Sequence, residues 1–582
     1  MTTGTPSLLA QGLLQDPGAV PLVIGVTGHR DPRPDVMEVV RKSTGQQLRQ
    51  LLTALPHTPL VMLNGMAAGM DTEIAEEFLA VVAQQRAEHP PGAEPLPQHQ
   101  LVAALPKTPE QFAGDFSDEP SLQRMQALLQ RCDAVLHPGN CQELRIPARP
   151  EGQATASTDP TPYAQQGVFV VRHCYLLLAF YDGIDTKLMG GTPQVVAMQR
   201  EDIHPLFVNV AEVAASREPA ALISVATPRC KHPYPEHQLG EFRYWPMPGE
   251  RAEHISRDAT IPDELLQLPR QLDVINQSMA QADAAPLDDR EGRRTVLHSV
   301  LSREAGALKQ RHERWILLVV LFGFALVVIA ELLEGTAWFG LAVLVLLVSL
   351  ALLPRLQQAS KVRFIEKRAL VECMAVQYLW SAVGVELDTA DLFHVRNHTQ
   401  LRIARLVLRA VKVQLLSLYS REARPMEQAV ASASTWVQGQ VKFFTKRISD
   451  FRRSNRRCHN AAWLMGGLAA AVGFAQLLPG APEDLYVAAI VLLAASASAY
   501  AYGELIGYEE TANRYERSLE QFSRGVRALK MLSSGEVGTL GADPGNPWLR
   551  HRIVMEAMGR EKIDELNDWI ADQIQRIYRP GS

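Results

Sequence analysis

The chain has 582 residues, of which 47% are hydrophobic, and a formal net charge of −5 at pH 7. This length exceeds what a single hydrophobic core serves, so we expect at least two domains. The small negative charge excludes a global basic field of the kind that binds nucleic acid. The six cysteines are scattered, without C-x-x-C or Cys/His metal spacing. They predict a reducing compartment and neither a disulfide framework nor a metal site.

The N-terminal part alternates short apolar runs with helical patterns. Residues 1–18 have no basic segment followed by an apolar core, so we expect a flexible leader and a cytoplasmic domain rather than a signal peptide. A mobile loop is expected at 147–162, which is rich in Pro, Gly, Ser and Thr. The alternation predicts an α/β fold over residues 19–240, a Rossmann-like doubly wound parallel sheet. The expected strands are 20–26, 60–63, 101–105, 134–137, 175–180, 205–210 and 222–225, and the expected helices are 36–55, 72–85, 121–131, 167–173 and a segment from 193 onward.

Three glycine-bearing loops follow predicted strands, at residues 27–31, 64–71 and 189–192. In a doubly wound sheet these loops meet at the carboxyl edge, where ligands bind. A glycine turn that opens a helix also exposes backbone N–H groups to an anion. With an aspartate at the end of the strand 175–180, the loops predict a phosphate or nucleotide site. The candidate ligand-binding residues are Thr27, Gly28, His29, Arg30, Gly65, Gly69, Asp71, Asp182, Gly190, Gly191 and Thr192.

Each polar candidate also fits a structural role. His29 and Asp182 fit hydrogen bonding within their own turns, and Asp71 fits the dipole of its helix. Arg30 fits pairing with Asp31, although beside two glycine turns its planar fork favours an anion. The chain contains neither G-x-x-x-x-G-K-[ST] nor G-x-G-x-x-G, which argues against a Walker A site and against ordinary dinucleotide oxidoreductase chemistry.

Segments VTGHR (26–30), GMAAGMD (65–71) and 177–192 resemble the SLOG family, a Rossmann-like group that includes the LOG phosphoribohydrolases and many nucleotide-sensing domains. The resemblance covers about residues 19–230. It implies a nucleotide-derived ligand, such as a nucleotide or a cyclic or ADP-ribose-type molecule, whose phosphate or ribose is cradled by the glycine turns. LOG enzymes carry G-G-x-G-T-x-x-E, whose glutamate takes part in cleaving the base from the ribose phosphate. Here residues 190–196 read GGTPQVV, without that glutamate, which favours binding without turnover.

The C-terminal half predicts four membrane spans in two hairpins, at 315–333 with 339–353 and at 461–478 with 485–502. The first has 19 residues of which only Glu331 is charged, close to the roughly 20 needed to cross a bilayer. Small residues four apart, such as Gly466 and Ala470, predict close helix packing, either within a hairpin or between subunits. The expected parts are a leader (1–18), a ligand-binding domain (19–240), a helical connector (241–313), the first hairpin (314–355), a cytoplasmic helical region (356–460), the second hairpin (461–503) and C-terminal cytoplasmic helices (504–582).

Charges predict the orientation of the hairpins. Clusters of Lys and Arg precede residue 315, follow residue 353 and precede residue 461, whereas the hairpin tips carry Glu334, Glu483 and Asp484. The positive-inside rule places both ends and the middle of the chain in the cytoplasm. We therefore expect a multi-pass protein of the inner (plasma) membrane of a bacterium.

The first hairpin together with residues 361–384 resembles the SLATT family, in which two membrane spans precede a cytoplasmic helical segment and which often accompanies SLOG domains. The resemblance implies a membrane effector, pore-forming or membrane-disrupting, in bacterial conflict and antiphage systems that use nucleotide signals. The combined prediction is a homo-oligomeric membrane sensor of a nucleotide derivative, with no catalytic residues and no nucleic-acid partner.

Two other functions stay open. One is a membrane-tethered nucleoside monophosphate phosphoribohydrolase of LOG type, with Asp71, Glu73 or Asp182 replacing the missing glutamate. The other is a membrane scaffold whose N-terminal fold has lost its ligand.

Overall fold

The computed structural model describes residues 18–137, 159–201, 203, 221–230, 241–245, 254–283, 296–334, 336, 338–385, 387–393, 401–421, 426–480, 482, 484–534 and 548–578. The predicted strand 205–210 and most of the predicted loop 147–162 lie outside these residues. The chain divides into two compact units. One, the α/β unit, comprises Met1–Val300 and Cys373–Ala429. The other, the helical unit, comprises Leu301–Glu372 and Val430–Ser582.

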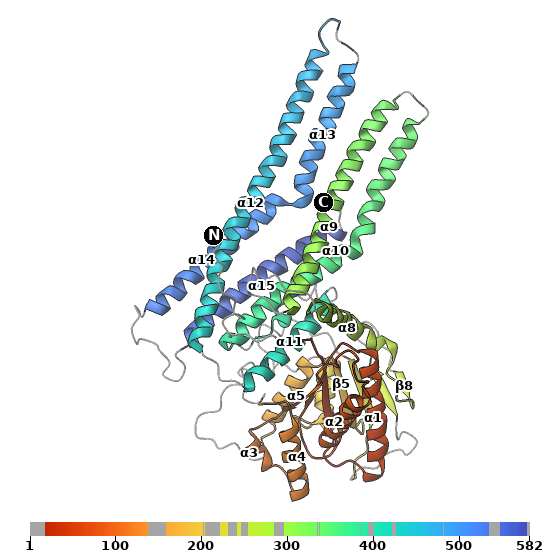
Figure 1. Cartoon of the computed structure of the whole chain (residues 1–582), viewed down its shortest axis with the longest axis vertical. Helices are drawn as coiled ribbons and strands as arrows, with labels where there is room; N and C mark the ends of the chain where they lie inside the picture. The colour runs from red at the N-terminus through yellow and green to blue at the C-terminus, as the bar shows by residue number, and fades with distance from the viewer. Residues whose placement is uncertain are drawn as a thin grey trace. The chain divides into compact units, whose positions relative to one another are not determined.

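The α/β unit is built on one eight-stranded sheet with the order β4-β3-β2-β1-β5-β6-β7-β8 (Figure 1). The strands β1, β2, β5 and β6 are apolar almost throughout and buried, as expected of strands that helices cover on both faces. The six strands from β4 to β6 pair in parallel. The strands are β1 (Leu22–Gly28), β2 (Leu60–Asn64), β3 (Gln100–Ala104), β4 (Ala134–Leu136), β5 (Leu176–Tyr181), β6 (Ala221–Ala226), β7 (Phe242–Trp245) and β8 (His254–Ser256).

The prediction of a purely parallel sheet is wrong at one edge. Strand β7 pairs antiparallel with β6, and β8 pairs antiparallel with β7. These strands fall where the sequence indicated a polar connector. An antiparallel partner needs no helical crossover, so the strand–helix alternation gave no sign of them. The four residues of β7 do alternate, with Phe242 and Tyr244 buried.

The helices of the α/β unit form two groups. Helix α1 packs on α2 and α2 packs on α4, whereas α5 packs on α6. From β1 the chain moves outward to β4, then returns to β5 on the other side of β1. Right-handed crossovers therefore place the two groups on opposite faces, and the direction switches between β1 and β5. The helices are α1 (Pro34–Ala54), α2 (Met70–Glu88), α3 (Pro109–Ala113), α4 (Glu119–Arg131), α5 (Thr161–His173) and α6 (Thr192–Arg200).

Segments from later in the sequence complete the α/β unit. Helix α11 (Arg402–Arg421) packs on β4, α5 and α8 (Asp263–Asp283). Asp391, in the short helix η5 (Thr389–Leu392), accepts a hydrogen bond from Arg409 at 3.0 Å and lies 3.5 Å from Arg172 of α5. Burial works to raise the pKa of Asp391, but these arginines outweigh it and the pKa is lowered. The α/β unit is thus assembled from two separate parts of the chain.

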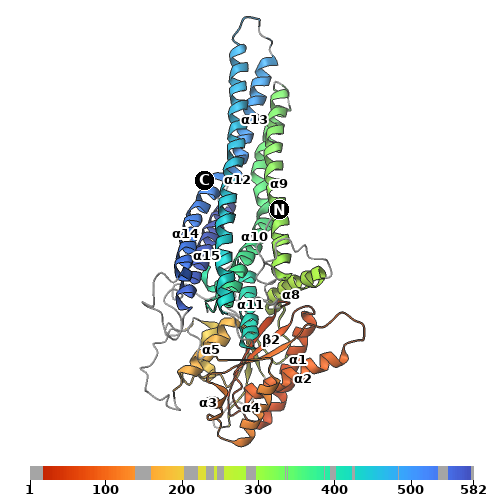
Figure 2. The same ribbon diagram turned by 60° about the vertical axis from the view of Figure 1, so that its left-hand side comes forward.

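Long helices make up the helical unit. Helices α12 and α13 are joined at one tip, as Figures 1 and 2 both show. Ser496 of α13 donates from its hydroxyl to the carbonyl oxygen of Ala462 at 2.7 Å, and a Cβ on Gly466 would lie 3.2 Å from the same hydroxyl. Gly466 therefore allows close packing within this hairpin. The long helices are α9 (Val296–Leu332), α10 (Phe339–Val383), α12 (Met426–Ala475), α13 (Asp484–Ile506), α14 (Tyr508–Ser534) and α15 (Leu549–Tyr578).

Among the described residues, two helical stretches are long and apolar enough to cross a membrane, whereas we predicted four. They are Leu297–Leu332 and Leu485–Ser533, and 6% and 0% of their apolar windows are buried, so neither is a core helix of its unit. Of the second predicted span, Phe339–Ser349 is found as a shorter apolar segment at the start of the long helix α10. The third is the end of α12, where Ala and Gly make the helix only weakly apolar.

Candidate functional site

The loop after β1 lies at the switch point and ties two neighbouring elements together. The backbone N–H of His29 donates to Phe180 of β5 at 3.0 Å, and its carbonyl oxygen accepts from Met70 of α2 at 3.1 Å. A Cβ on Gly28 would lie 2.4 Å from the Cβ of Met70, and a Cβ on Gly69 would lie 2.6 Å from the carbonyl oxygens of His29 and Arg30. These two glycines therefore let the first two loops meet.

His29 and Asp182 form a buried pair. The Nε2 atom of His29 accepts from the backbone N–H of Asp182 at 3.1 Å and lies 3.1 Å from its Oδ1. Burial lowers the pKa of His29 by more than Asp182 raises it, so the ring is neutral at pH 7. Oδ1 also accepts from the N–H of Ile184 at 3.0 Å, which is the turn role that the sequence suggested. Oδ2 is buried and has no hydrogen-bond partner among the described residues.

Asp71 is a second buried carboxylate, in the first turn of α2. Its side chain is close to Gly65, where a Cβ would lie 3.0 Å from Oδ2 and 2.8 Å from the amide of Gln166. Its Oδ1 has no hydrogen-bond partner among the described residues. Burial raises the pKa of Asp71 to about 7, and the opposing effects of backbone hydrogen bonds and of Arg30 are smaller. The group therefore titrates near neutral pH.

The third loop packs against the start of α5. Gly190 has a φ of +74°, and a Cβ there would lie 2.5 Å from that of Tyr163. Gly191 precedes α6, and the backbone N–H groups of this turn are engaged: that of Gly190 donates to Oε1 of Gln194 at 2.6 Å and that of Gly191 to the carbonyl oxygen of Leu188 at 3.1 Å. The hydroxyls of Thr192 and Thr27 are 3.4 Å apart, which joins this loop to the first. All eleven predicted residues therefore belong to one connected cluster at the carboxyl ends of β1, β2 and β5.

The side chain of Arg30 hydrogen-bonds to Tyr163 and attracts the buried carboxylate of Asp71. The predicted alternative partner of Arg30, Asp31, pairs instead with Arg229 at 2.7 Å. The guanidinium of Arg30 lies 5.3 Å from the centre of the Tyr163 ring, and Lys107 Nζ lies 5.3 Å from the same centre. Two cations therefore flank this ring at the edge of the site.

The sequence reasoning missed Tyr163, Lys107, Asp115 and Gln166. The hydroxyl of Tyr163 donates to Asp115, which also accepts from Lys107 at 2.8 Å. Lys107 follows β3 as the glycine loops follow their strands, so its position was a usable signal, but no glycine marked it. Tyr163 and Gln166 lie in α5, the helix that connects β4 to β5 across the sheet. No local sequence signal places this helix beside the glycine loops.

Glu73 does not serve as a free carboxylate. It forms an ion pair with Arg124 and lies 3.5 Å from Arg41, while Glu76 pairs with the other nitrogen of Arg124 at 2.6 Å. These acidic residues hold α2 to α1 and α4 rather than facing solvent alone. Among the described residues, no group of three or more His, Cys, Asp or Glu could hold a metal ion.

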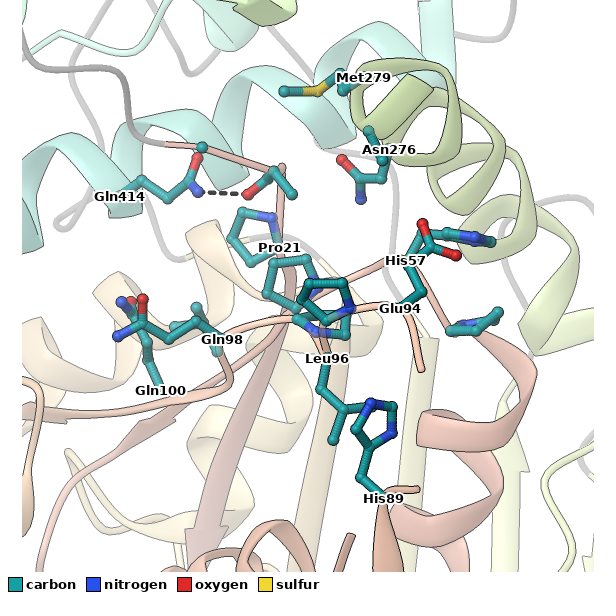
Figure 3. A pocket seen from close by; sticks show the side chains of 18 of the residues that line it. Pro21, His57, His89, Glu94, Leu96, Gln98, Gln100, Asn276, Met279 and Gln414 are labelled. Carbon is teal, nitrogen blue, oxygen red and sulfur yellow. Dashed lines mark hydrogen bonds between the residues drawn. The ribbon is translucent and has the colours of Figure 1, made fainter. Parts of the chain in front are cut away.

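A cavity of about 750 Å³ lies at the opposite edge of the sheet, before β1, β2 and β3 (Figure 3). Asn276 of α8 and Gln414 of α11 close it by hydrogen bonds to the carbonyl oxygens of Val20, at 2.8 Å, and Ala19, at 2.7 Å. No Lys or Arg of the described residues lines this cavity. It therefore does not fit a phosphate, and it contains none of the eleven predicted residues.

The cluster at the carboxyl edge combines three features. The dipole at the N-terminus of α6 and the guanidinium of Arg30 favour a phosphate, whereas Lys107 is paired with Asp115. Two buried carboxylates each keep an oxygen without a protein partner, which suits ligand hydroxyls. Comparison of the chain with models of protein families, with curated proteins and with solved structures found no match. The chemistry of this cluster is therefore the basis for a function.

Proposed function

We propose that the protein is a membrane-anchored sensor of a nucleotide derivative, whose SLOG-like domain gates a transmembrane effector in bacterial signalling or antiphage defence. The observation that carries the proposal is the convergence of Arg30 with Asp71 and Asp182 at the switch point, where each carboxylate has an oxygen without a hydrogen-bond partner among the described residues. A cation and buried carboxylates side by side match a ligand that bears both phosphate and ribose.

Each part of the ligand has a place in this proposal. The phosphate lies at the N-terminus of α6 beside Arg30, where the guanidinium and the helix dipole favour an anion. Oδ2 of Asp182 and Oδ1 of Asp71 accept hydrogen bonds from ribose hydroxyls, which removes the cost of leaving buried acceptors unpaired. The base lies near Tyr163, the aromatic side chain at the edge of the site.

The proposed effector is the helical unit, which α9 and α13 anchor in the bacterial inner membrane with both chain ends in the cytoplasm. Supporting it are the two stretches that are long and apolar enough to span, and the Lys and Arg clusters that flank them. The response is a pore formed in a homo-oligomer or a disturbance of the bilayer.

Backbone continuity supports coupling between sensor and effector. The chain passes between its two units at residues 300/301, 372/373 and 429/430, and each passage lies inside a helix, α9, α10 or α12. A ligand that binds two states of the α/β unit with different affinity then shifts the helices that continue into the hairpins.

A thermal-shift screen of the full-length chain in detergent tests the sensor. The panel comprises nucleoside monophosphates, cyclic nucleotides and ADP-ribose derivatives. The full chain is needed because residues 373–429 belong to the α/β unit. A ligand present at 100 times its Kd stabilises the folded protein by about 2.7 kcal/mol, which is a readily measured shift.

Arg30→Ala is expected to weaken the ligand found in this screen about tenfold, the loss of one charge-assisted hydrogen bond. Arg86→Ala is the matched control, because Arg86 is exposed at the far end of α2. An equal effect of the two substitutions, or no shift with any compound of the panel, would contradict the sensor.

The properties of Asp71 support a second candidate function, that of a LOG-type phosphoribohydrolase tethered to the membrane. A carboxyl with a pKa of about 7 and a free oxygen suits general acid–base catalysis at neutral pH. Recovery of the ligand after the screen separates the two functions. Recovery of intact ligand from the wild type supports the sensor. Recovery of a free base from the wild type, but of intact ligand from Asp71→Asn, supports the hydrolase.

A further inference from the structure

A second cluster of cations surrounds a cavity of about 340 Å³ inside the helical unit. We call it the basic cavity and define it by the four cations that line it. They come from three helices: Lys309 of α9, Lys361 and Arg368 of α10, and Arg447 of α12. Two carboxylates also line it, Glu313 and Glu372, so positive charge is in excess.

Both carboxylates of the lining are already engaged. Glu313 lies 3.6 Å from Lys309, one turn away on the same helix. Glu372 lies 3.3 Å from Lys562 of α15, whose side chain is 4% exposed. Among the described residues, no carboxylate lies within ion-pair distance of Arg368 or Arg447, although Glu372 and Glu565 attract Arg368 from farther away.

Aromatic side chains hold the two arginines in place. The guanidinium of Arg368 lies 3.9 Å from the centre of the Trp569 ring and donates to the hydroxyl of Tyr515 at 3.2 Å. The guanidinium of Arg447 lies 5.6 Å from the centre of the Phe443 ring. A guanidinium stacked on an aromatic face keeps its N–H edge free for an oxyanion. Like charges that share a cavity repel each other, and a bound anion would relieve that repulsion.

The basic cavity lies at the border between polar and apolar helix segments. Ile316 of α9, at the start of the uncharged run that follows Arg314, lines it. Leu505 and Ile506, which end the apolar helix α13, line it as well. If these runs cross the bilayer, as the proposed function requires, the cavity lies at the depth of the lipid headgroups. Basic pockets between helices at this depth suit anionic headgroups.

We propose that the basic cavity binds a phosphate group, presented by an anionic phospholipid at the cytoplasmic face of the membrane. The phosphate oxygens accept hydrogen bonds from Arg368 and Arg447, while Trp569 and Phe443 keep both guanidinium groups in position. The site lies in the helical unit and is separate in the fold from the ligand site at the carboxyl edge of the sheet.

The test uses the full-length protein in nanodiscs of phosphatidylcholine alone or of phosphatidylcholine mixed with phosphatidylglycerol. Thermal unfolding is measured in both, and inorganic phosphate is titrated in a third arm. We expect phosphatidylglycerol to raise the melting temperature. Arg447→Gln should weaken this lipid effect about tenfold, the loss of one charge-assisted contact.

Two controls keep the outcomes separate. Arg453→Gln removes the same charge from an exposed position of α12 outside the cavity lining and should leave the lipid effect unchanged. Arg447 is itself exposed, so its loss should not prevent folding. If inorganic phosphate alone saturates the shift, the phosphate site stands and its source is soluble rather than lipid. Equal shifts in both lipids, or equal losses in both variants, would overturn the proposal.

Insertion into phosphatidylcholine is scored separately, by flotation of vesicles and resistance to alkaline extraction. Protein that inserts but does not distinguish the lipids contradicts the basic cavity as a headgroup site while leaving the membrane sensor intact. Protein that does not insert contradicts the membrane part of the proposed function instead.

Discussion

Gly69→Ala is expected to abolish ligand binding and to lower the free energy of unfolding by about 3 kcal/mol. Gly69 has a φ of +87° and a ψ of −127°, a conformation that residues with a Cβ rarely adopt. The added Cβ would lie 2.6 Å from the carbonyl oxygens of His29 and Arg30. Those atoms are backbone, so the loop after β1 must move as a whole, and Arg30 moves with it.

Gly92→Ala is the matched control for this effect. Gly92 has a φ of +83°, but a Cβ there would meet nothing within 4 Å. The control therefore carries the cost of the backbone conformation alone, about 1 kcal/mol, and should leave binding unchanged. Ligand titration and thermal unfolding of the full-length variants measure both quantities. Equal losses of stability in the two variants, or binding retained in Gly69→Ala, would show that the two loops do not meet as described.

Asp71→Asn is expected to stabilise the protein above pH 7 while weakening its ligand. Burial raises the pKa of Asp71 from an ordinary 3.8 to about 7 in the folded state. A shift of this size corresponds to about 4 kcal/mol of penalty for the ionised group. A buried asparagine amide without a partner takes back about 1–3 kcal/mol, so we expect a net gain of about 2 kcal/mol.

The free energy of unfolding of the wild type should depend on pH through Asp71. Between pH 3.8 and about 7 the folded protein keeps a proton on Asp71 that the unfolded chain has released. The contribution of Asp71 to stability therefore falls as the pH rises through this window and is constant above it. Thermal unfolding across the window should show this slope in the wild type and lack it in Asp71→Asn.

Glu38→Gln, at an exposed position of α1, is the control for Asp71→Asn and should change neither the slope nor binding. A variant that gains no stability above pH 7 would contradict the cost that burial imposes on the ionised Asp71. An Asp71→Asn variant that binds the ligand as tightly as the wild type would show that Asp71 does not contact the ligand.

Much of the α/β unit follows from local sequence pattern. The continuous apolar runs of β1, β2 and β5 predict strands buried on both faces, and each begins and ends within two residues of its prediction. The antiparallel strands β7 and β8 are too short to form such runs. The place of α11 in this unit has no local signal, because its contacts with β4 and α5 join distant parts of the chain.

The candidate site divides in the same way. The three glycine loops were predictable because glycine at a strand end has a specific geometric meaning, realised here at Gly28, Gly69 and Gly190. Arg30 was predicted as a ligand-binding residue, but its proximity to Lys107 at the Tyr163 ring was not, since these residues come together only through the order of the strands. The second and third predicted spans were based on apolar runs in the sequence. In the structure these runs are parts of the longer helices α10 and α12, whose other segments are polar, so the runs alone did not show where each helix begins and ends.

Dye release from lipid vesicles that contain the full-length protein tests the central claim most directly. The ligand found in the thermal-shift screen is added to vesicles with the wild type or with Arg30→Ala. We expect release that requires the ligand and that needs about ten times more of it in the variant. Release that is independent of the ligand, or a ligand that binds without any release, would contradict a sensor at the sheet edge that gates a membrane effector.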